Sequence, residues 1–369
     1  MTPMNFTVVT GTARTLIPLA APSQRVQVSP TPSRRAPAET RGAFRLPSLL
    51  TRRAALALGG VALVTPPWAR AQIVTGSFVV AGLTPVPRTA AHWVALFDEL
   101  RRNGFLEGIN LSVRGYGIAP DRLEPAAAEF VKAGVHAIVT GGAGPTRVAQ
   151  RATPTIPILT AVDEFVEQGF VTSLSRPGGN ITGVSILGPA LDAKRLEILI
   201  EIAPHVRSIA ILADPNSTPA DSQRALEETV GPRGIRITTY RAGQQSEIGP
   251  AIDAAGQAGA QAFNVLASQF FNVNRAEIMA RIGRLRVPAI YQWPEWTLEG
   301  ALAAYGPRFT TVYRQVARQL AKVLRGARPA EIPIEQPTNF ELVVNLKQAK
   351  AIGLTIPAEI LFRADSVIE

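Results

Sequence analysis

AIVTGGAGPTRVAQ, residues 137–150, contains a short pattern from which the architecture can be inferred. An apolar run typical of a buried strand leads into a turn with three glycines and then into a helix expected to start near Pro145. Proline suits the first helical turn, where its missing N–H would have no partner. Glycines let the backbone approach another group closely, and the free N–H groups of a helix N-terminus favour an anion. The turn therefore predicts an anion site formed by Thr140, Gly141, Gly142, Gly144, Pro145, Thr146 and Arg147.

Similar apolar runs recur along the chain and alternate with amphipathic helical stretches. Four of the later runs begin about 27 residues apart, the length of one strand plus one helix. Alternation of this kind predicts parallel sheets with helices on both faces, which is an α/β fold. The ten predicted strands cover residues 76–83, 111–117, 136–142, 155–162, 180–186, 207–214, 234–241, 260–268, 287–293 and 301–306.

Ten strands are more than one compact doubly wound domain needs, so we expect two Rossmann-like lobes of five strands each. Helices predicted over residues 90–104 and 308–326 carry the apolar stripe of helices that pack on a sheet. The lobes are expected to join near residues 187–189, with a hinge and a cleft between them. The predicted N-terminal lobe covers residues 73–187 and 306–330, and the predicted C-terminal lobe covers residues 188–305 and 331–369.

The composition excludes several classes of active site. The chain has no cysteine, which removes disulfides, thiol catalysis and thiolate metal sites. The three histidines, His92, His136 and His205, are far apart in sequence, and none of the patterns HExxH, GxSxG or GxxxxGK(S/T) occurs. We therefore expect no catalytic centre, no metal and no cofactor.

The net charge of +10 is not spread evenly over the chain. Residues 1–71 contribute +8 of it, from nine arginines and one acidic residue, Glu39, which leaves +2 for the remaining 298 residues. A nucleic-acid-binding protein would instead carry its basic residues on the folded domain. The basic character therefore belongs to a leader, and we expect no nucleic-acid partner.

The leader ends in a pattern typical of an export signal. An arginine pair at 52–53 precedes an apolar run of about eleven residues, and a small-x-small site follows at 69–71. That run is shorter than the roughly 20 residues that span a bilayer. We expect cleavage between Ala71 and Gln72, export by the general secretory or twin-arginine route, and a periplasmic protein. The first 50 residues are expected to be disordered or untranslated.

Three interpretations of the glycine turn remain open. A dinucleotide site needs G-x-G-x-x-G with an acid about 20 residues further on; Asp163 meets the second condition, but Arg147 stands where the third glycine belongs. The turn also opens the third strand–helix unit rather than the first, and an exported protein rarely meets free nucleotides. The other two interpretations are a bound carboxylate and a purely structural turn.

Polar and aromatic residues follow several other predicted strands, at the edge where ligands of open α/β sheets bind. Acidic residues there could meet an ammonium group or cap a helix; they are Asp163, Glu164, Asp214 and Glu295. Aromatic residues there could stack on a ligand or pack in the core; they are Phe270, Phe271, Tyr291, Trp293, Trp296 and Tyr305. Trp293 and Trp296 flank a Pro-Glu turn, which is unlike the interior of a strand.

Several longer stretches resemble one protein family. They are FDELRRNGFLEGINLSV (97–113), SLSRPGGNITGVS (173–185), KRLEILIEIAP (194–204), RSIAILADPN (207–216), VPAIYQW (287–293), AYGPRFTTVYRQVA (304–317) and PIEQPTNFELVVNLKQAKAIGLTIP (333–357). The similarity runs in order through nearly all of residues 76–369, and the last stretch is the most specific. On these motifs the chain resembles ABC-transporter substrate-binding proteins of the tryptophan/tyrosine-uptake type.

The resemblance implies a type I periplasmic-binding fold with three crossovers, in which the lobes close on a small molecule without chemistry. It implies an amino acid, aromatic ones included, or a related carboxylate as ligand, and delivery to an ABC permease. We expect a monomer. With Asp214 and Trp293 from the strand ends, the predicted ligand contacts are Leu83, Thr84, Thr140, Gly141, Gly142, Gly144, Pro145, Thr146, Val162, Asp163, Asp214, Ser268, Gln269, Tyr291, Trp293 and Tyr305.

Two departures from the family pattern bear on the ligand. Gln269 stands where relatives often have Asp-Pro, and TAVDEFVEQGF (160–170) differs from the common GDP-VGxG form. Both changes remove or move acidic residues, so the recognition of an α-amino group is expected to differ. Two other functions stay open on the sequence: a ligand-sensing module of a receptor, which the same lobes could serve, and an exported α/β hydrolase.

Overall fold

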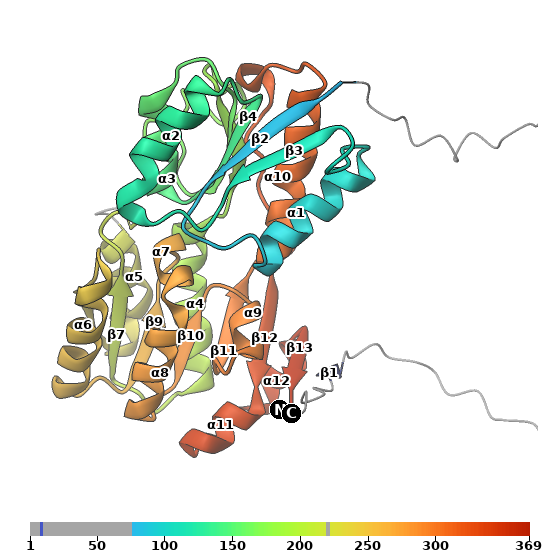
Figure 1. The fold of residues 1–369 in the computed structure, drawn as a ribbon. Helices are drawn as coiled ribbons and strands as arrows, with labels where there is room; N and C mark the ends of the chain where they lie inside the picture. Colours follow the sequence, from blue (N-terminus) through green and yellow to red (C-terminus); the bar gives the residue numbers. More distant parts are fainter. Residues whose placement is uncertain (1–7, 10–75, 219–221) are drawn as a thin grey trace, which may run out of the picture. The chain divides into compact units, whose positions relative to one another are not determined.

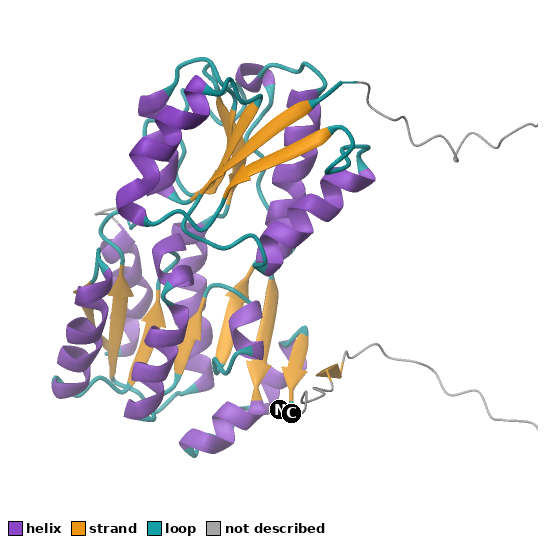
Figure 2. Cartoon of the chain, viewed as in Figure 1, coloured by secondary structure: helices purple, strands orange, loops and turns teal. Residues whose placement is uncertain are grey.

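The protein is described by a computed structural model that covers residues 8–9, 76–218 and 222–369 (Figure 1). The predicted leader and export signal lie outside these residues, except for the short strand β1 (Val8–Val9). The described chain forms two sheets with helices on both faces of each (Figure 2). We refer to the five-stranded sheet with its helices as the N-terminal lobe and to the larger sheet with its helices as the C-terminal lobe.

The sheet of the N-terminal lobe is entirely parallel, in the order β3-β2-β4-β5-β6. Its strands are β2 (Phe78–Leu83), β3 (Leu111–Gly115), β4 (Ala137–Gly141), β5 (Ile158–Val162) and β6 (Ile181–Ser185). Successive side chains of a strand point to opposite faces. Val139 therefore packs in one core and Ile138 in another, and burial on both faces explains why β4 is a continuous apolar run.

Helices cover both faces of this sheet. The core that contains Val139 also contains residues of α1 (Ala91–Arg102) and α10 (Phe309–Leu324). The core that contains Ile138 includes residues of α2 (Leu123–Lys132) and α3 (Ala143–Ala152). The helix α10 comes from far along the chain, so the N-terminal lobe is completed by a segment that follows most of the C-terminal lobe.

The sheet of the C-terminal lobe has the order β1-β13-β12-β11-β10-β9-β7-β8. Five of its strands are mutually parallel: β7 (Ser208–Ala213), β8 (Arg236–Arg241), β9 (Ala262–Val265), β10 (Ala289–Tyr291) and β11 (Ala303–Gly306). The strand β12 (Glu341–Asn345) pairs antiparallel with β11, and β13 (Ser366–Ile368) pairs parallel with β12. The strand β1 pairs antiparallel with β13.

Two groups of helices cover this second sheet. On one face lie α6 (Gln245–Gln257) and α8 (Arg275–Leu285). On the other lie α4 (Gly188–Ile202), α5 (Ser222–Val230), α11 (Leu346–Ile352) and α12 (Ala358–Arg363). The remaining elements are short: α7 (Gln269–Val273), α9 (Glu295–Leu298) and the 3-10 turns η2 (Pro120–Arg122), η3 (Gly231–Arg233) and η4 (Pro329–Glu331).

Within residues 76–369, the chain crosses between the lobes three times. It passes from β6 to α4, from β11 to α10, and from α10 back to β12. Before the third crossing, Glu335 exchanges backbone hydrogen bonds with β6, donating to Gly183 O (3.0 Å) and accepting from Ser185 N (2.9 Å). Residues near 335 therefore run along the N-terminal lobe before the chain returns to β12. The lobe boundaries predicted from the sequence stay a prediction.

The two-lobed α/β architecture predicted from the sequence is confirmed, and all ten predicted strands are present within a few residues. The expectation of five strands in each lobe is wrong for the C-terminal lobe. Residues 341–345 and 366–368 add β12 and β13 beyond β11. They were hard to recognise because they do not alternate with long helices, and because one pairs antiparallel.

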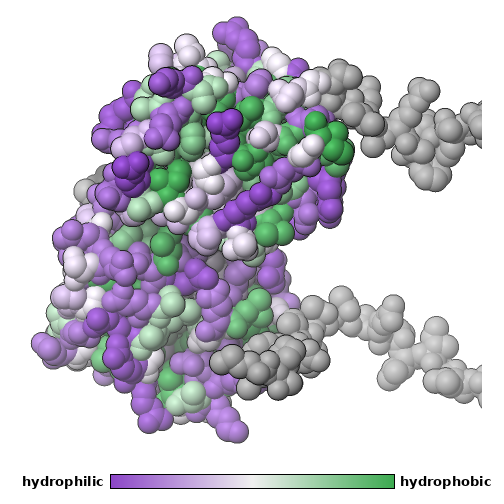
Figure 3. All heavy atoms as spheres, viewed as in Figure 1, coloured by the Kyte–Doolittle hydropathy of each residue, from purple (hydrophilic) through white to green (hydrophobic). Residues whose placement is uncertain are grey.

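The surface mixes polar and apolar residues. On the face in Figure 3, apolar spheres are scattered among predominantly hydrophilic ones. Ile109 and Phe362, both strongly exposed, belong to different lobes. Among the residues that the structure describes, no helix is both long enough and apolar enough to cross a bilayer.

Candidate functional site

The carboxyl ends of the parallel strands in the two lobes point toward the junction between the lobes (Figure 1). Ligands of open α/β sheets bind at such ends. Two hollows lie here, each lined by residues from both lobes. The first, which we call the cavity, has a volume of about 180 Å³, and the second, which we call the crevice, has about 10 Å³.

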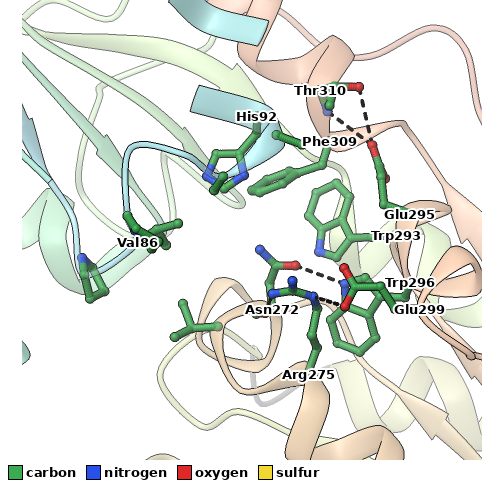
Figure 4. Close-up of a pocket in the computed structure, with 15 residues that line it drawn as sticks. Val86, His92, Asn272, Arg275, Trp293, Glu295, Trp296, Glu299, Phe309 and Thr310 are labelled. Carbon is green, nitrogen blue, oxygen red and sulfur yellow. Dashed lines mark hydrogen bonds and ion pairs between the residues drawn. The ribbon is translucent and has the colours of Figure 1, made fainter. Parts of the chain in front are cut away.

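The cavity lies between the connection from β2 to α1, the start of α10, and the loops after β9 and β10 (Figure 4). Its wall combines aromatic, aliphatic and charged side chains from both lobes. The lining residues are Pro85, Val86, Pro87, Ala90, Ala91, His92, Asn272, Val273, Arg275, Trp293, Glu295, Trp296, Glu299, Phe309 and Thr310. A concave site with an apolar wall and few polar groups is the usual form of a small-molecule site.

Three rings from two lobes form the aromatic wall of the cavity. The ring centroids of Trp293 and Phe309 are 4.3 Å apart, and those of His92 and Phe309 are 4.5 Å apart. All three side chains are buried. Such flat, rigid surfaces favour an aromatic or apolar ligand group by contact area and by ring stacking.

Polar side chains close the side of the cavity formed by the C-terminal lobe. The Trp296 Nε1–H donates to Asn272 Oδ1 (3.0 Å). The Arg275 Nε–H donates to Glu299 Oε2 (2.7 Å), and its Nη1 donates to the Asn272 carbonyl (3.1 Å). On the opposite side of Trp293 in Figure 4, Glu295 Oε1 accepts from the backbone N–H of Thr310 (3.3 Å) and from its hydroxyl (3.4 Å).

Three side chains in the cavity wall have a buried polar atom without a hydrogen-bond partner among the described residues. These atoms are His92 Nε2, Trp293 Nε1 and Glu295 Oε2. Burial, and secondarily the charge of Arg275, lowers the pKa of His92 to about 3. His92 is therefore neutral at neutral pH, and Arg275 is the one cationic side chain among the described residues that line the cavity. Buried polar groups are normally paired, so the wall has unused hydrogen-bonding capacity.

The crevice is the place where the predicted glycine turn meets the C-terminal lobe. Gly142, with a φ of 78°, precedes α3, and a Cβ at this position would lie 2.7 Å from Gln269 Cβ. A Cβ at Gly141 would lie 2.4 Å from Tyr313 Oη. The close backbone approach predicted for these glycines is therefore present. The groups that approach the turn are side chains of the protein itself.

The hydroxyl groups of the turn are engaged beneath it. Thr146 Oγ1 donates to the Gly142 carbonyl (2.7 Å) and lies 2.8 Å from the hydroxyls of both Thr140 and Thr160. The three threonines are fully buried. Arg147 donates to Gln168 Oε1 (2.8 Å), and Gln168 is one of the residues that line the crevice. In this structure these side chains fix the turn, and their role as ligand contacts stays a prediction.

Two predicted acids lie next to the crevice in different settings. Asp163 Oδ1 accepts from the Gly188 N–H (2.7 Å), and burial raises the pKa of Asp163 to about 7. Asp214 accepts from Ser268 Oγ (2.7 Å), Ser217 Oγ (2.9 Å) and the backbone of Asn216 (2.9 Å). These bonds hold the turn at 215–218, and α5 begins only at Ser222, so the expectation that Asp214 caps a helix is wrong. Asp163 joins the end of β5 to the start of α4 across the first crossing.

The predicted ligand contacts thus fall into three groups. Gly142, Val162, Asp163, Ser268 and Gln269 come together at the crevice, and Trp293 lies in the cavity. The others line neither hollow: Leu83, Thr84, Thr140, Gly141, Gly144, Pro145, Thr146, Asp214, Tyr291 and Tyr305. Of these, Thr84 Oγ1 accepts from Val86 N (3.1 Å) and so shapes the cavity rim. Tyr291 packs under Trp296, with ring centroids 5.2 Å apart, and Tyr305 pairs with Phe340.

Sequence reasoning missed most residues of the cavity. It did not select His92, Asn272, Arg275, Glu299, Phe309 or Thr310 as ligand contacts. Several of them lie in the first turn of a helix that follows a strand, and Phe309 was assigned to a core stripe. Including the first turn of the helix that follows each strand would have found His92 and Asn272. In the described part of the chain, no group of three or more His, Asp or Glu side chains is arranged to hold a metal ion.

Known proteins provide an independent comparison. A family model described as ABC transporter substrate binding protein matches residues 100–368. The tyrosine-binding protein of Clostridioides difficile (strain R20291) is 25% identical over 263 residues, or 69% of this chain and 74% of that protein. An ABC domain from Streptococcus pneumonia, solved with L-Trp, has a TM-score of 0.72, with 20% identity, and covers 79% of this chain and 100% of its own. A conserved domain protein from Vibrio cholerae also has a TM-score of 0.72, with 26% identity over 80% of this chain and 100% of its own.

Proposed function

The chain belongs to the ABC transporter substrate binding protein family, and on this premise we propose that it captures a small solute outside the cytoplasm and delivers it to an ABC permease. The ligand is a carboxylate-bearing compound with an aromatic or apolar group, such as an amino acid. The protein acts by binding and release, as a monomer, without catalysis. The predicted export signal and the family together support the periplasmic location.

The cavity is the observation that carries this proposal. It is walled by both lobes, it has about 180 Å³ of space, and Trp293, Phe309 and His92 form its wall. A ligand held there contacts both lobes at once, because Phe309 and His92 belong to the N-terminal lobe and Trp293 to the C-terminal lobe. Such a ligand stabilises the closed arrangement of the lobes over the open one.

The aromatic character of the ligand is supported by the wall and by the relatives. The relative in Clostridioides difficile is described as binding tyrosine, and the structure from Streptococcus pneumonia contains L-Trp. Both ligands combine an aromatic ring with a carboxylate. We therefore assign the ring of the ligand to the Trp293–Phe309 wall and its polar groups to the side chains that close the cavity.

Closure and release involve the residues at the crossings. Gln269 packs on Gly142 across the junction, and Asp163 accepts a hydrogen bond from Gly188 at the first crossing. Hinge motion of this kind is absorbed by a few residues at the ends of elements, and the closed form is the one that a permease would recognise. Opening would separate Gln269 from Gly142 and expose the cavity to solvent.

A ligand screen tests the proposal. The purified protein would be heated with single amino acids, aromatic carboxylates, sugars and small peptides, and its unfolding temperature recorded. A true ligand at 100 times its dissociation constant should add about 2.7 kcal/mol to the free energy of unfolding. The same ligand should reduce the radius of gyration in solution scattering. No shift with any compound, or conversion of a compound to product, would refute the proposed function.

A further inference from the structure

We propose that Arg275 binds the anionic group of the ligand, with Asn272 and Trp293 as neutral partners, and that the glycine turn does not contact that group. This inference rests on the proposed function and specifies which side of the cavity reads the carboxylate. It makes Arg275 the residue that selects acids over amines.

The glycine turn is poorly suited to a carboxylate in this chain. Gln269 lies against Gly142, and the crevice beside them has only about 10 Å³, roughly the space of one water molecule. Asp163 lines the same crevice and would bring a carboxyl group close to the anion. The nearest arginine of the turn, Arg147, is directed to Gln168. The helix N-terminus therefore faces an amide and a carboxyl group of the protein rather than open space.

Hydrogen-bond donors instead gather on the side of the cavity formed by the C-terminal lobe. Arg275 uses Nε for Glu299 and Nη1 for the Asn272 carbonyl, and its Nη2 makes neither bond. The Trp296 indole can only donate, so Asn272 must present its Oδ1 to it and its Nδ2 to the other side. In Figure 4 that Nδ2 points toward the cavity between Val86 and Trp293.

Trp293 supplies an independent indication of a bound group. Its side chain is only 1% exposed, and its Nε1–H has no partner among the described residues. An indole N–H can only donate, so its missing partner is an acceptor. Arg275, Asn272 and Trp293 thus offer a guanidinium and two neutral donors to one acceptor group, and a carboxylate has two acceptor oxygens.

The acidic residues of the cavity do not cancel this arrangement. Glu299 is held by Arg275 Nε at 2.7 Å and is partly exposed. Glu295 lies on the other side of Trp293, next to Thr310. The indole therefore separates the proposed anion site from the carboxylate of Glu295. His92 is neutral, which leaves Arg275 as the cation among the described residues that line the cavity.

Three probes with the same ring separate the possibilities: indole-3-acetate carries only a carboxylate, tryptamine only an ammonium group, and L-tryptophan both. Calorimetric titration of the full chain should show binding of indole-3-acetate and L-tryptophan and weaker or no binding of tryptamine. Arg275→Gln should weaken binding of both acids by about 10- to 100-fold, the loss expected for a charge-assisted hydrogen bond. Arg284→Gln, an exposed arginine on the same helix, is the matched control and should bind as the unaltered protein does.

Two results would overturn the assignment while leaving solute binding intact. One is equal affinity of the acids for the Arg275→Gln and Arg284→Gln proteins. The other is tighter binding of tryptamine than of indole-3-acetate. If none of the three indoles binds, the ligand class inferred here is wrong, and the wider screen then decides separately whether the protein binds solutes. Unfolding temperatures of both variants establish that they are folded.

Discussion

The cavity and the crevice lie at the same junction of the lobes, but their walls differ in how polar groups are satisfied. None of the residues that line the crevice has a buried side-chain polar atom without a partner among the described residues, whereas the cavity has three such residues. The crevice has about 10 Å³ of space and the cavity about 180 Å³. The contrast separates a region that fixes the lobes from a region that can accept a ligand.

The crevice side is reinforced by a buried arginine at the crossings. The side chain of Arg195, on α4, is fully buried and pairs with Asp192. Its guanidinium donates to the Gly188 carbonyl at the first crossing (3.0 Å) and to the Tyr305 carbonyl near the second (3.1 Å). One side chain therefore connects two of the three chain crossings. We therefore expect substitutions near the crevice to change mainly the free energy of unfolding. Substitutions in the cavity wall should change mainly the affinity for the ligand.

The largest expected effect is the loss of Arg195. Arg195→Met leaves Asp192 buried without its counter-charge and two carbonyls without donors, so unfolding should become easier by about 3–5 kcal/mol. Urea unfolding of the purified protein measures this. Arg284→Met is the exposed control and should change stability by less than about 0.5 kcal/mol. Adding Asp192→Leu to Arg195→Met should recover part of the loss, and no difference between Arg195→Met and the control would contradict the proposed role.

The buried carboxyl group of Asp163 should make the free energy of unfolding depend on pH. Burial raises its pKa from 3.8 to about 7, so between these values the native state holds a proton that the unfolded chain releases. Stability from this group is complete below about pH 4 and falls as the pH rises through about 7. Asp163→Asn keeps an acceptor for Gly188 and should add on the order of 3 kcal/mol at pH 8 and little at pH 4.

The measurement for Asp163 compares unfolding curves of the variant and the unaltered protein at pH 4, 6 and 8. The exposed Asp121→Asn variant serves as the matched control and should show no trend with pH. A stabilisation by Asp163→Asn that is equal at all three pH values would mean that the carboxyl group does not titrate in this range.

A third change tests the packing of the glycine turn. Gly142→Ala places a Cβ 2.7 Å from Gln269 Cβ at a φ of 78°, which costs about 1–3 kcal/mol in strained backbone alone. Gly144→Ala, in the first turn of α3, has no atom within 4 Å of its new Cβ and should be neutral or slightly stabilising. Thermal unfolding distinguishes the two. Equal stability of both variants would show that the turn does not pack on Gln269.

Much of the fold could be predicted because its signals are local. A strand buried on both faces, such as β4, is a continuous apolar run, and the helix after it starts at a glycine turn, so strand and helix are both visible in the sequence. The strands β12 and β13 follow no such repeat. The pairing of β12 with β11, and of β13 with β12, depends on a return of the chain from α10, and sequence patterns of single elements do not contain that information.

The candidate site was predicted less completely, for a related reason. Trp293 was selected because tryptophans around a Pro-Glu turn do not suit a strand. His92 and Phe309 have the spacing of core residues on their helices, and only the approach of the two lobes turns them into a cavity wall. Arg275 looks like any exposed helix residue in the sequence. Its proposed role depends on Asn272, three residues earlier, and on Trp293, which follows β10.

Among these substitutions, Arg275→Gln is expected to have the smallest effect on stability. It is also the one with the largest proposed effect on ligand binding. The Arg275–Glu299 pair is partly exposed, with 36% and 42% of the two side chains accessible, and such pairs contribute about 0–1 kcal/mol. Arg275→Gln should therefore shift the unfolding midpoint no more than Arg284→Gln does, while it weakens the binding of carboxylates. Urea unfolding without ligand measures the first quantity, and titration measures the second. If Arg275→Gln lost several kcal/mol of stability, the guanidinium would be a structural element of the junction like Arg195, and the distinction between the two regions would fail.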